Sequence, residues 1–147
     1  MHTVRDLLQA KGNKVWSITP QATVYEALEL MAARNVGALM VMEAEKVVGI
    51  FSERDYARRV ILKGRSSRTT VVSELMTRDV LYVGTAETVE DCMALMTEKR
   101  VRHLPVIEKD RLLGIVSIGD VVKEIISDRE FTIRALEHYI TGGHTTL

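Results

Sequence analysis

The sequence predicts an α+β protein made of two tandem β-α-β-β-α units that pack with pseudo-two-fold symmetry. Residues 15–55 align with residues 80–120 at a shift of 65 positions without a gap, and 13 of the 41 pairs are identical. Within each copy the apolar spacing changes from a strand period to a helix period and back, at the same places. One copy alone is too short to bury a stable core, so we expect the two copies to pack together.

Each copy begins with a short apolar strand, at residues 15–18 and 80–83. A helix follows, with apolar residues at every third and fourth position. Its start is marked in both copies by a threonine and a carboxylate three positions later, which is the spacing of a capping box. These pairs are Thr23 with Glu26 and Thr88 with Asp91.

Two further strands are expected in each copy, at residues 38–42 and 47–51 and at residues 104–107 and 112–116. The polar residues between them have the length of a hairpin loop. A second helix begins at Ser52 or Ser117. The first strand reaches the hairpin through a crossover helix, so this connection should be right-handed.

We expect three segments along the chain. Residues 1–70 form the first unit with an N-terminal helix and a linker, and residues 71–128 form the second unit. Residues 129–147 form an amphipathic helix and tail, because Ile133, Leu136 and Ile140 recur at helical spacing. We expect a C2 homodimer through the helices of the units, extended by this tail; the alternative is that the tail folds back on its own chain.

Composition excludes several classes of protein. Twenty Lys and Arg balance 20 Asp and Glu, so no overall field attracts nucleic acid or an anionic membrane. The longest apolar run, residues 36–42, is far shorter than the roughly 20 residues that span a bilayer, and no secretory signal opens the chain. These features predict a soluble, cytoplasmic protein. The single cysteine, Cys92, and four scattered histidines predict no metal site, and the absence of known catalytic motifs predicts that the protein is not an enzyme.

Residues 102–107, Arg-His-Leu-Pro-Val-Ile, and residues 114–120, Gly-Ile-Val-Ser-Ile-Gly-Asp, resemble the second half of a CBS motif. Residues 37–42 and 49–55 match the same pattern, so the chain resembles a Bateman module, a pair of CBS motifs, over about residues 3–127. The resemblance implies a stand-alone regulatory module that signals to an unidentified partner. It also implies adenosine-containing ligands in clefts between the motifs: AMP, ADP, ATP or NAD, or alternatively S-adenosylmethionine. A structural protein with vestigial sites is the other alternative.

Two Ser-x-x-Asp sequences, Ser52 with Asp55 and Ser117 with Asp120, are the leading candidates for the binding site. Their spacing is that of a capping box, and capping alone would explain it. A helix start also offers free N–H groups to a phosphate. The family resemblance implies that the aspartate binds the ribose hydroxyls, which we expect of Asp120 above all and also of Asp55.

The other candidates surround these two sequences. We expect His103, between Arg102 and Pro105, to face the phosphate and to be partly charged near pH 7. Arg54 and Arg58 share a helix face within a stretch of six cations, which is either solvated surface or a polyphosphate site. The remaining candidates line the base pocket or the cleft: Ile18, Thr19, Gly37, Ala38, Val83 and Thr85. Gly49 and Gly114 are more simply explained by tight packing than by ligand contact.

The two clefts should differ in affinity or in ligand. His103-Leu-Pro105 in the second copy corresponds to Ala38-Leu-Met40 in the first, which lacks the imidazole and the proline. Thr19-Pro20 in the first copy corresponds to Gly84-Thr85 in the second. One of the two clefts is therefore a candidate to stay empty.

Overall fold

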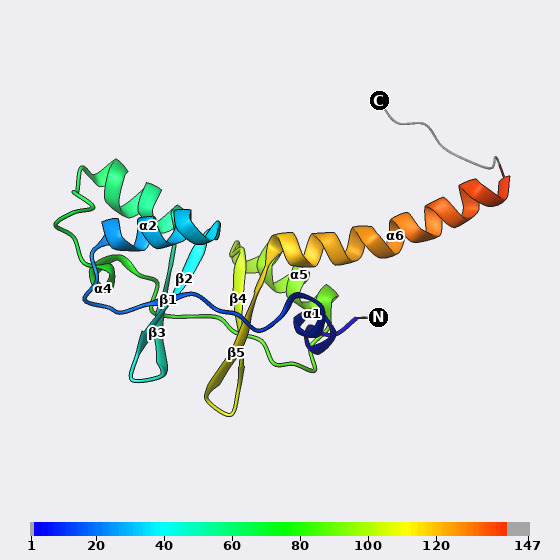
Figure 1. Ribbon diagram of the computed structural model, residues 1–147, viewed down its shortest axis with the longest axis horizontal. Helices are drawn as coiled ribbons and strands as arrows, with labels where there is room; N and C mark the ends of the chain where they lie inside the picture. Colours follow the sequence, from blue (N-terminus) through cyan, green and yellow to red (C-terminus); the bar gives the residue numbers. More distant parts are fainter. Residues whose placement is uncertain (1, 141–147) are drawn as a thin grey trace.

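The computed structural model describes residues 2–140, except for the side chains of residues 128–132, 135 and 138–140. Two small sheets lie side by side, and their hairpins point in the same direction (Figure 1). Each sheet has its own buried core, so the molecule has two similar halves. The predicted α+β class with two β-α-β-β-α units is confirmed.

The first half contains a three-stranded sheet in the order β1-β2-β3, with β1 parallel and β3 antiparallel to β2. A discontinuous helix follows β3, in which one α-helical turn passes into a π-helical and then a 3-10 segment. The elements are β1 (Ser17–Ile18), α2 (Val24–Arg34), β2 (Ala38–Glu43), β3 (Lys46–Ser52), α3 (Glu53–Asp55), η1 (Tyr56–Val60) and η2 (Ile61–Lys63).

The second half repeats this order around the antiparallel pair β4 and β5. Its first strand is reduced to a single parallel bridge between Val83 and Val106. There the N–H of Val83 donates to the carbonyl of Pro105 and the N–H of Ile107 donates to the carbonyl of Val83, both at 3.0 Å. The elements are α4 (Val72–Leu75), α5 (Val89–Lys99), β4 (His103–Glu108), β5 (Arg111–Ser117) and α6 (Ile118–Ile140).

Equivalent residues adopt equivalent local geometry in the two halves. The capping boxes predicted at Thr23 and Thr88 are both present. The following helices end at Asn35 and Arg100, 65 positions apart, with φ of 54° and 55°. The hairpins turn through two residues each, all with positive φ, as in a type I′ turn. Both ladders also shift register at equivalent places, between Val41 and Met42 and between Val106 and Ile107.

The two short helices that precede the units are exchanged between the halves. Helix α1 (Val4–Lys11) buries Val4, Leu7 and Leu8 in the core of the second half, whereas the sequence analysis grouped it with the first unit. Conversely, Val72 and Leu75 of α4 lie in the core of the first half. The boundary expected between residues 70 and 71 placed each short helix with the unit that follows it in the sequence. In the structure each of these helices covers the sheet of the other unit.

Helix α6 is continuous from Ile118 to Ile140 and extends away from the two sheets (Figure 1). The boundary expected between residues 128 and 129 therefore falls inside one helix. Ile126, Ile133 and Leu136 are exposed on it. Within the described part of the chain, no helix combines the length and the apolar character needed to cross a membrane.

Gly49 and Gly114 lie where the exchanged segments approach the strands. A Cβ atom on Gly49 would lie 2.6 Å from Sδ of Met76 and 3.0 Å from the carbonyl oxygen of Thr77. A Cβ atom on Gly114 would lie 2.8 Å from a methyl group of Leu8. Both glycines thus permit close packing, as the sequence suggested.

We expect Gly49→Ala to lower the free energy of unfolding by about 1–3 kcal/mol, the usual cost of overpacking, because the backbone of Thr77 cannot yield as a side-chain end can. Urea denaturation followed by circular dichroism measures this change. Gly119→Ala is the matched control, since its Cβ would meet only Oγ of Ser117, at 3.6 Å. Equal stability of the two variants would contradict the packing argument.

Candidate functional site

A cleft of about 770 Å³ lies between the two halves, within the usual size range of small-molecule sites. We call it the first cleft. One wall is the end of β3 with α3 and η1, and the other is the loop from α5 to β4. Its lining residues are Gly37, Ile50, Ser52, Glu53, Arg54, Asp55, Arg58, Arg59, Thr77, Lys99, Arg100, Val101, Arg102 and His103.

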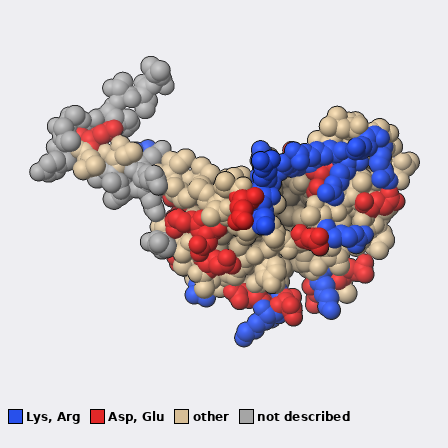
Figure 2. All heavy atoms as spheres, turned by 180° about the vertical axis from the view of Figure 1, so that it is seen from behind, with Lys and Arg blue, Asp and Glu red and all other residues tan. Residues whose placement is uncertain are grey.

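The first cleft is strongly basic although the whole chain is neutral. Six of its lining residues are Lys or Arg, and two are carboxylates. Figure 2 shows Lys and Arg side chains gathered around the hollow between the halves. Arg58 is exposed there and has no hydrogen bond or ion pair with any residue that the structure describes. The cleft therefore favours an anionic ligand.

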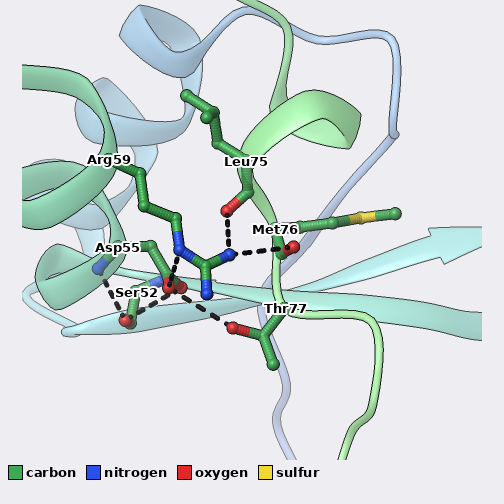
Figure 3. A network of polar contacts seen from close by, with 6 residues as sticks. All are labelled: Ser52, Asp55, Arg59, Leu75, Met76 and Thr77. Atoms are coloured by element: carbon green, nitrogen blue, oxygen red, sulfur yellow. Dashed lines mark hydrogen bonds and ion pairs between the residues drawn. The ribbon is translucent and has the colours of Figure 1, made fainter. Parts of the chain in front are cut away.

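Asp55 is held at the floor of this cleft by the cap at the start of α3. Its Oδ2 accepts hydrogen bonds from the N–H of Ser52 at 2.9 Å and from the Ser52 hydroxyl at 3.1 Å. Its Oδ1 accepts only a long hydrogen bond from the Thr77 hydroxyl at 3.3 Å and lies 3.9 Å from Nε of Arg59 (Figure 3). Since a carboxylate oxygen has two lone pairs, Oδ1 retains the capacity to accept from a ligand.

Arg59 joins Asp55 to the segment that links the two units. Its guanidinium donates to the carbonyls of Leu75 at 3.1 Å and Met76 at 3.4 Å (Figure 3). The next residue, Thr77, forms a two-way backbone bridge with Ile50 of β3. The Ser52–Asp55 cap, the first cleft and the linker at residues 75–77 thus belong to one hydrogen-bonded network.

Sequence reasoning left Arg59, Thr77 and Arg100 out of the candidate site. The π-helical geometry of η1 carries Arg58 and Arg59 onto the cleft together, and an α-helical spacing counted from Arg54 selects Arg58 alone. The basic group at residues 99–102 was visible as a charge cluster, but only the tertiary structure brings it opposite Arg54. There the Arg54 guanidinium donates to the Arg100 carbonyl at 2.6 Å.

His103 lies at the start of β4 and lines the first cleft. Burial, together with the nearby cations Lys11 and Arg102, lowers its pKa below the ordinary value, and the attraction of Asp120 does not compensate. The lowered pKa favours the neutral imidazole, whereas the expectation of partial charge near pH 7 took the pKa of an exposed histidine.

The second Ser-x-x-Asp sequence has the same cap but a different neighbour. The N–H of Ser117 donates to Oδ2 of Asp120 at 2.9 Å, and the N–H of Asp120 donates to the Ser117 hydroxyl at 3.1 Å. Nζ of Lys11 also donates to Oδ2 of Asp120, at 2.5 Å. Burial by itself would raise the pKa of Asp120, but the hydrogen bonds from Lys11 and Ser117 outweigh it and leave the pKa below its usual value.

The first cleft brings together about half of the residues selected from the sequence: Gly37, Ser52, Arg54, Asp55, Arg58, Arg102 and His103. The others lie outside its lining: Ile18, Thr19, Ala38, Val83, Thr85, Pro105, Ser117 and Asp120. Among these, Ala38, Val83 and Pro105 are buried. Thr85 donates through its N–H and its hydroxyl to Glu108, at 2.7 and 2.8 Å. Ligand binding by either group stays a prediction.

The 65-residue repeat shows how unequal the two halves are in charge. Four basic residues of the first cleft correspond to uncharged or acidic residues at the equivalent positions: Arg54 to Gly119, Arg59 to Glu124, Arg100 to Asn35 and Arg102 to Gly37. The cations that line the first cleft around Asp55 are therefore largely missing around Asp120.

A family model described as CBS domain matches residues 4–62 and again residues 72–127. The CBS domain-containing protein CBSX3, mitochondrial, of Arabidopsis thaliana is 41% identical over 152 residues, which cover 97% of this chain and 73% of that protein. A solved structure from Burkholderia ambifaria, described as a candidate signal-transduction protein with CBS domains, is 46% identical. It covers 86% of this chain and 95% of its own, with a TM-score of 0.83.

The solved hexameric CBS-CP12 protein from bloom-forming cyanobacteria is 25% identical, with a TM-score of 0.73 over 95% of this chain and 88% of its own. These similarities confirm the resemblance to a pair of CBS motifs drawn from residues 37–55 and 102–120. A cytoplasmic location for this chain stays a prediction, and the name of the Arabidopsis relative places that protein in mitochondria.

The lowered pKa of His103 predicts a pH dependence of stability. As pH falls, His103 in the unfolded chain binds a proton near the ordinary histidine pKa of about 6.5, whereas His103 in the folded chain does so only at a lower pH. The stabilisation from this difference is therefore present above a pH of about 6.5 and is lost as pH falls below it. We expect the free energy of unfolding to fall between pH 7.5 and pH 5, and to fall less in His103→Gln. Urea denaturation at each pH measures it. The carboxylates with lowered pKa values change the stability only at lower pH. Parallel profiles of the free energy of unfolding against pH for the wild type and His103→Gln would contradict the assignment to His103.

Proposed function

The chain belongs to the CBS-domain family, and from this membership and the first cleft we propose that it is a non-catalytic sensor of adenine nucleotides. CBS-domain proteins are regulatory or signal-transduction modules. The proposed ligand is AMP, ADP, ATP or NAD, and the proposed response is a conformational change passed to a partner protein. One observation carries the proposal: a helix-start carboxylate and six cations line a single cleft.

Asp55 is the proposed ribose ligand. Vicinal hydroxyls donate hydrogen bonds, and Asp55 lines the cleft with an Oδ1 that has only the long contact from Thr77 and the distant ion pair with Arg59 to compete. Hydrogen bonds to a charged acceptor are the stronger kind and contribute about 1.5–3 kcal/mol each. A hydroxyl of the ligand would displace the Thr77 hydroxyl at little cost.

The basic residues are the proposed phosphate ligands. Arg54 and Arg58 on one wall face Arg102 on the other, so a phosphate chain would be neutralised from both sides. This charge favours ADP and ATP over AMP, and it disfavours S-adenosylmethionine, which carries a sulfonium cation. We expect affinity in the order ATP, ADP, AMP.

The linker is the proposed route of the signal. Arg59 contacts both Asp55 and the carbonyls of Leu75 and Met76, and the hydroxyl of Thr77 in the same segment contacts Asp55. A ribose on Asp55 would replace the Thr77 contact and change how the linker is held. Because α4 lies in the core of the first half, a shift of the linker would reach that core.

We expect Asp55→Asn to weaken ATP binding at least tenfold, because the charge-assisted hydrogen bonds to the ribose are lost. Asp120→Asn is the matched control, since it is the same change at the equivalent position of the repeat. Its expected effect on affinity is less than twofold. Isothermal titration calorimetry with ATP, ADP, AMP, NAD and S-adenosylmethionine measures both.

Thermal melting of both variants separates a loss of binding from a loss of folding. Unchanged affinity in Asp55→Asn would overturn the ribose assignment. No binding of any of the five ligands would favour the alternative, a structural or interaction protein with vestigial sites.

The assembly that we propose is a C2 homodimer through the helices of the units, extended by α6. On α6, Ile126, Ile133 and Leu136 are exposed at spacings of seven and three residues, which is the seam spacing of paired helices. This part of α6 lies beyond the two sheets (Figure 1).

Truncation after Asp128 is expected to weaken dimerisation at least tenfold and to leave ATP affinity unchanged, since it removes Ile133 and Leu136 but no residue of the first cleft. Light scattering at micromolar concentration measures the mass. Ile133→Ser with Leu136→Ser tests the same seam in the full chain. An unchanged dimer would assign the tail another role, and a monomeric full chain would refute the dimer.

A further inference from the structure

We propose that Lys11 closes the second Ser-x-x-Asp sequence from within the chain, so that the protein binds one nucleotide where its repeat would suggest two. This inference rests on the proposed function, because it concerns the ribose-type acceptor Asp120. Lys11 is thus a residue that determines how many ligands the module takes.

The Lys11 ammonium neutralises the carboxylate that a ligand would need and occupies one of its two oxygens. Nζ donates to Oδ2 of Asp120 at 2.5 Å and to the carbonyl of Ile115 at 2.9 Å. Oδ2 of Asp120 also accepts from the backbone of Ser117. A hydrogen-bonded ion pair at 2.5 Å competes directly with neutral hydroxyls for the carboxylate.

Helix α1 delivers Lys11 to this place and is anchored along its length. At its start, the N–H groups of Val4 and Arg5 donate to the carbonyls of Glu87 at 2.8 Å and Thr85 at 3.1 Å. In its middle, Leu8 packs against Gly114, where a Cβ would lie only 2.8 Å away. The helix ends at Gly12, whose φ of 95° suits glycine, so Lys11 is its last residue.

The first half shows what the same position looks like without the lysine. The 65-residue repeat does not extend to this segment, where the equivalent contacts pair Val4 with Val72 and Leu8 with Met76. Thr77, one residue after Met76, reaches Asp55, whereas Lys11, three residues after Leu8, reaches Asp120. The neighbour of Asp55 from this segment is thus a neutral hydroxyl at 3.3 Å, and the neighbour of Asp120 is a cation at 2.5 Å. The exchange of α1 and α4 between the halves is what brings these different residues to equivalent carboxylates.

The test is the number of adenosine molecules bound per chain in Lys11→Met, which keeps the unbranched side chain and removes the charge; adenosine offers the ribose hydroxyls without a phosphate, whose basic ligands are largely missing around Asp120. Lys14→Met is the matched control, because Lys14 lies over the ring of Trp16 and its cation is 5.0 Å from the ring centre. Calorimetry on the full chain is expected to give one site for the wild type and Lys14→Met, and two sites for Lys11→Met. Adding Asp120→Asn to Lys11→Met is expected to remove the second site.

The same titration in an Asp55→Asn background separates this inference from the proposed function. There Lys11→Met is expected to restore one site, with an affinity at least tenfold above that of Asp55→Asn alone. The wild type could also bind no ligand while Lys11→Met binds one that is lost when Asp120→Asn is added. That result would support the closure by Lys11 and overturn the role of Asp55. Two sites in the wild type would overturn the closure. So would a Lys11→Met variant that melts at the same temperature as the wild type and gains no site.

Discussion

The reciprocal hydrogen bonds between a serine and the aspartate three residues later are the constraint from which the binding architecture follows. In both halves they start the helix after the hairpin and hold the aspartate against the backbone N–H of the serine. The carboxylate therefore has a set position before any ligand is present. A helix cap, common in any protein, becomes a candidate binding group here because the cap lies at the junction of the two halves.

What reaches the capped carboxylate differs between the halves, and this difference comes from the exchanged short helices. A segment that packs on the opposite sheet can carry any side chain to the cap without disturbing the core that it covers. The linker brings Thr77 to Asp55, and α1 brings Lys11 to Asp120. One fold, used twice, can in this way give equivalent carboxylates different neighbours while each half keeps a buried core of its own.

The distribution of charge also depends on which distant elements meet at the junction of the two halves. The chain is neutral overall, yet six of its cations line one cleft, because α3 and η1 of the first half face the end of α5 across the junction. Burial lowers the pKa of His103, so its neutral form is favoured beside these arginines. The cleft thus contains permanent charge from arginine and lysine, beside a histidine whose lowered pKa favours the neutral form.

The sequence by itself determined the features that depend on contacts between near neighbours. The repeat, the capping boxes at Thr23 and Thr88, the hairpins and the Ser-x-x-Asp caps all involve residues a few positions apart, where spacing is sufficient information. The tertiary structure decided what lies between distant segments: the exchange of α1 and α4, the contact of Lys11 with Asp120, and the place of Arg59 beside Thr77. It also decided the direction in which the pKa of His103 shifts, because burial is a property of the packed molecule. Hydrogen bonds across three residues are encoded locally, whereas contacts across 70 or 100 residues depend on how whole elements pack, and apolar periodicity shows only which face is buried and not against what.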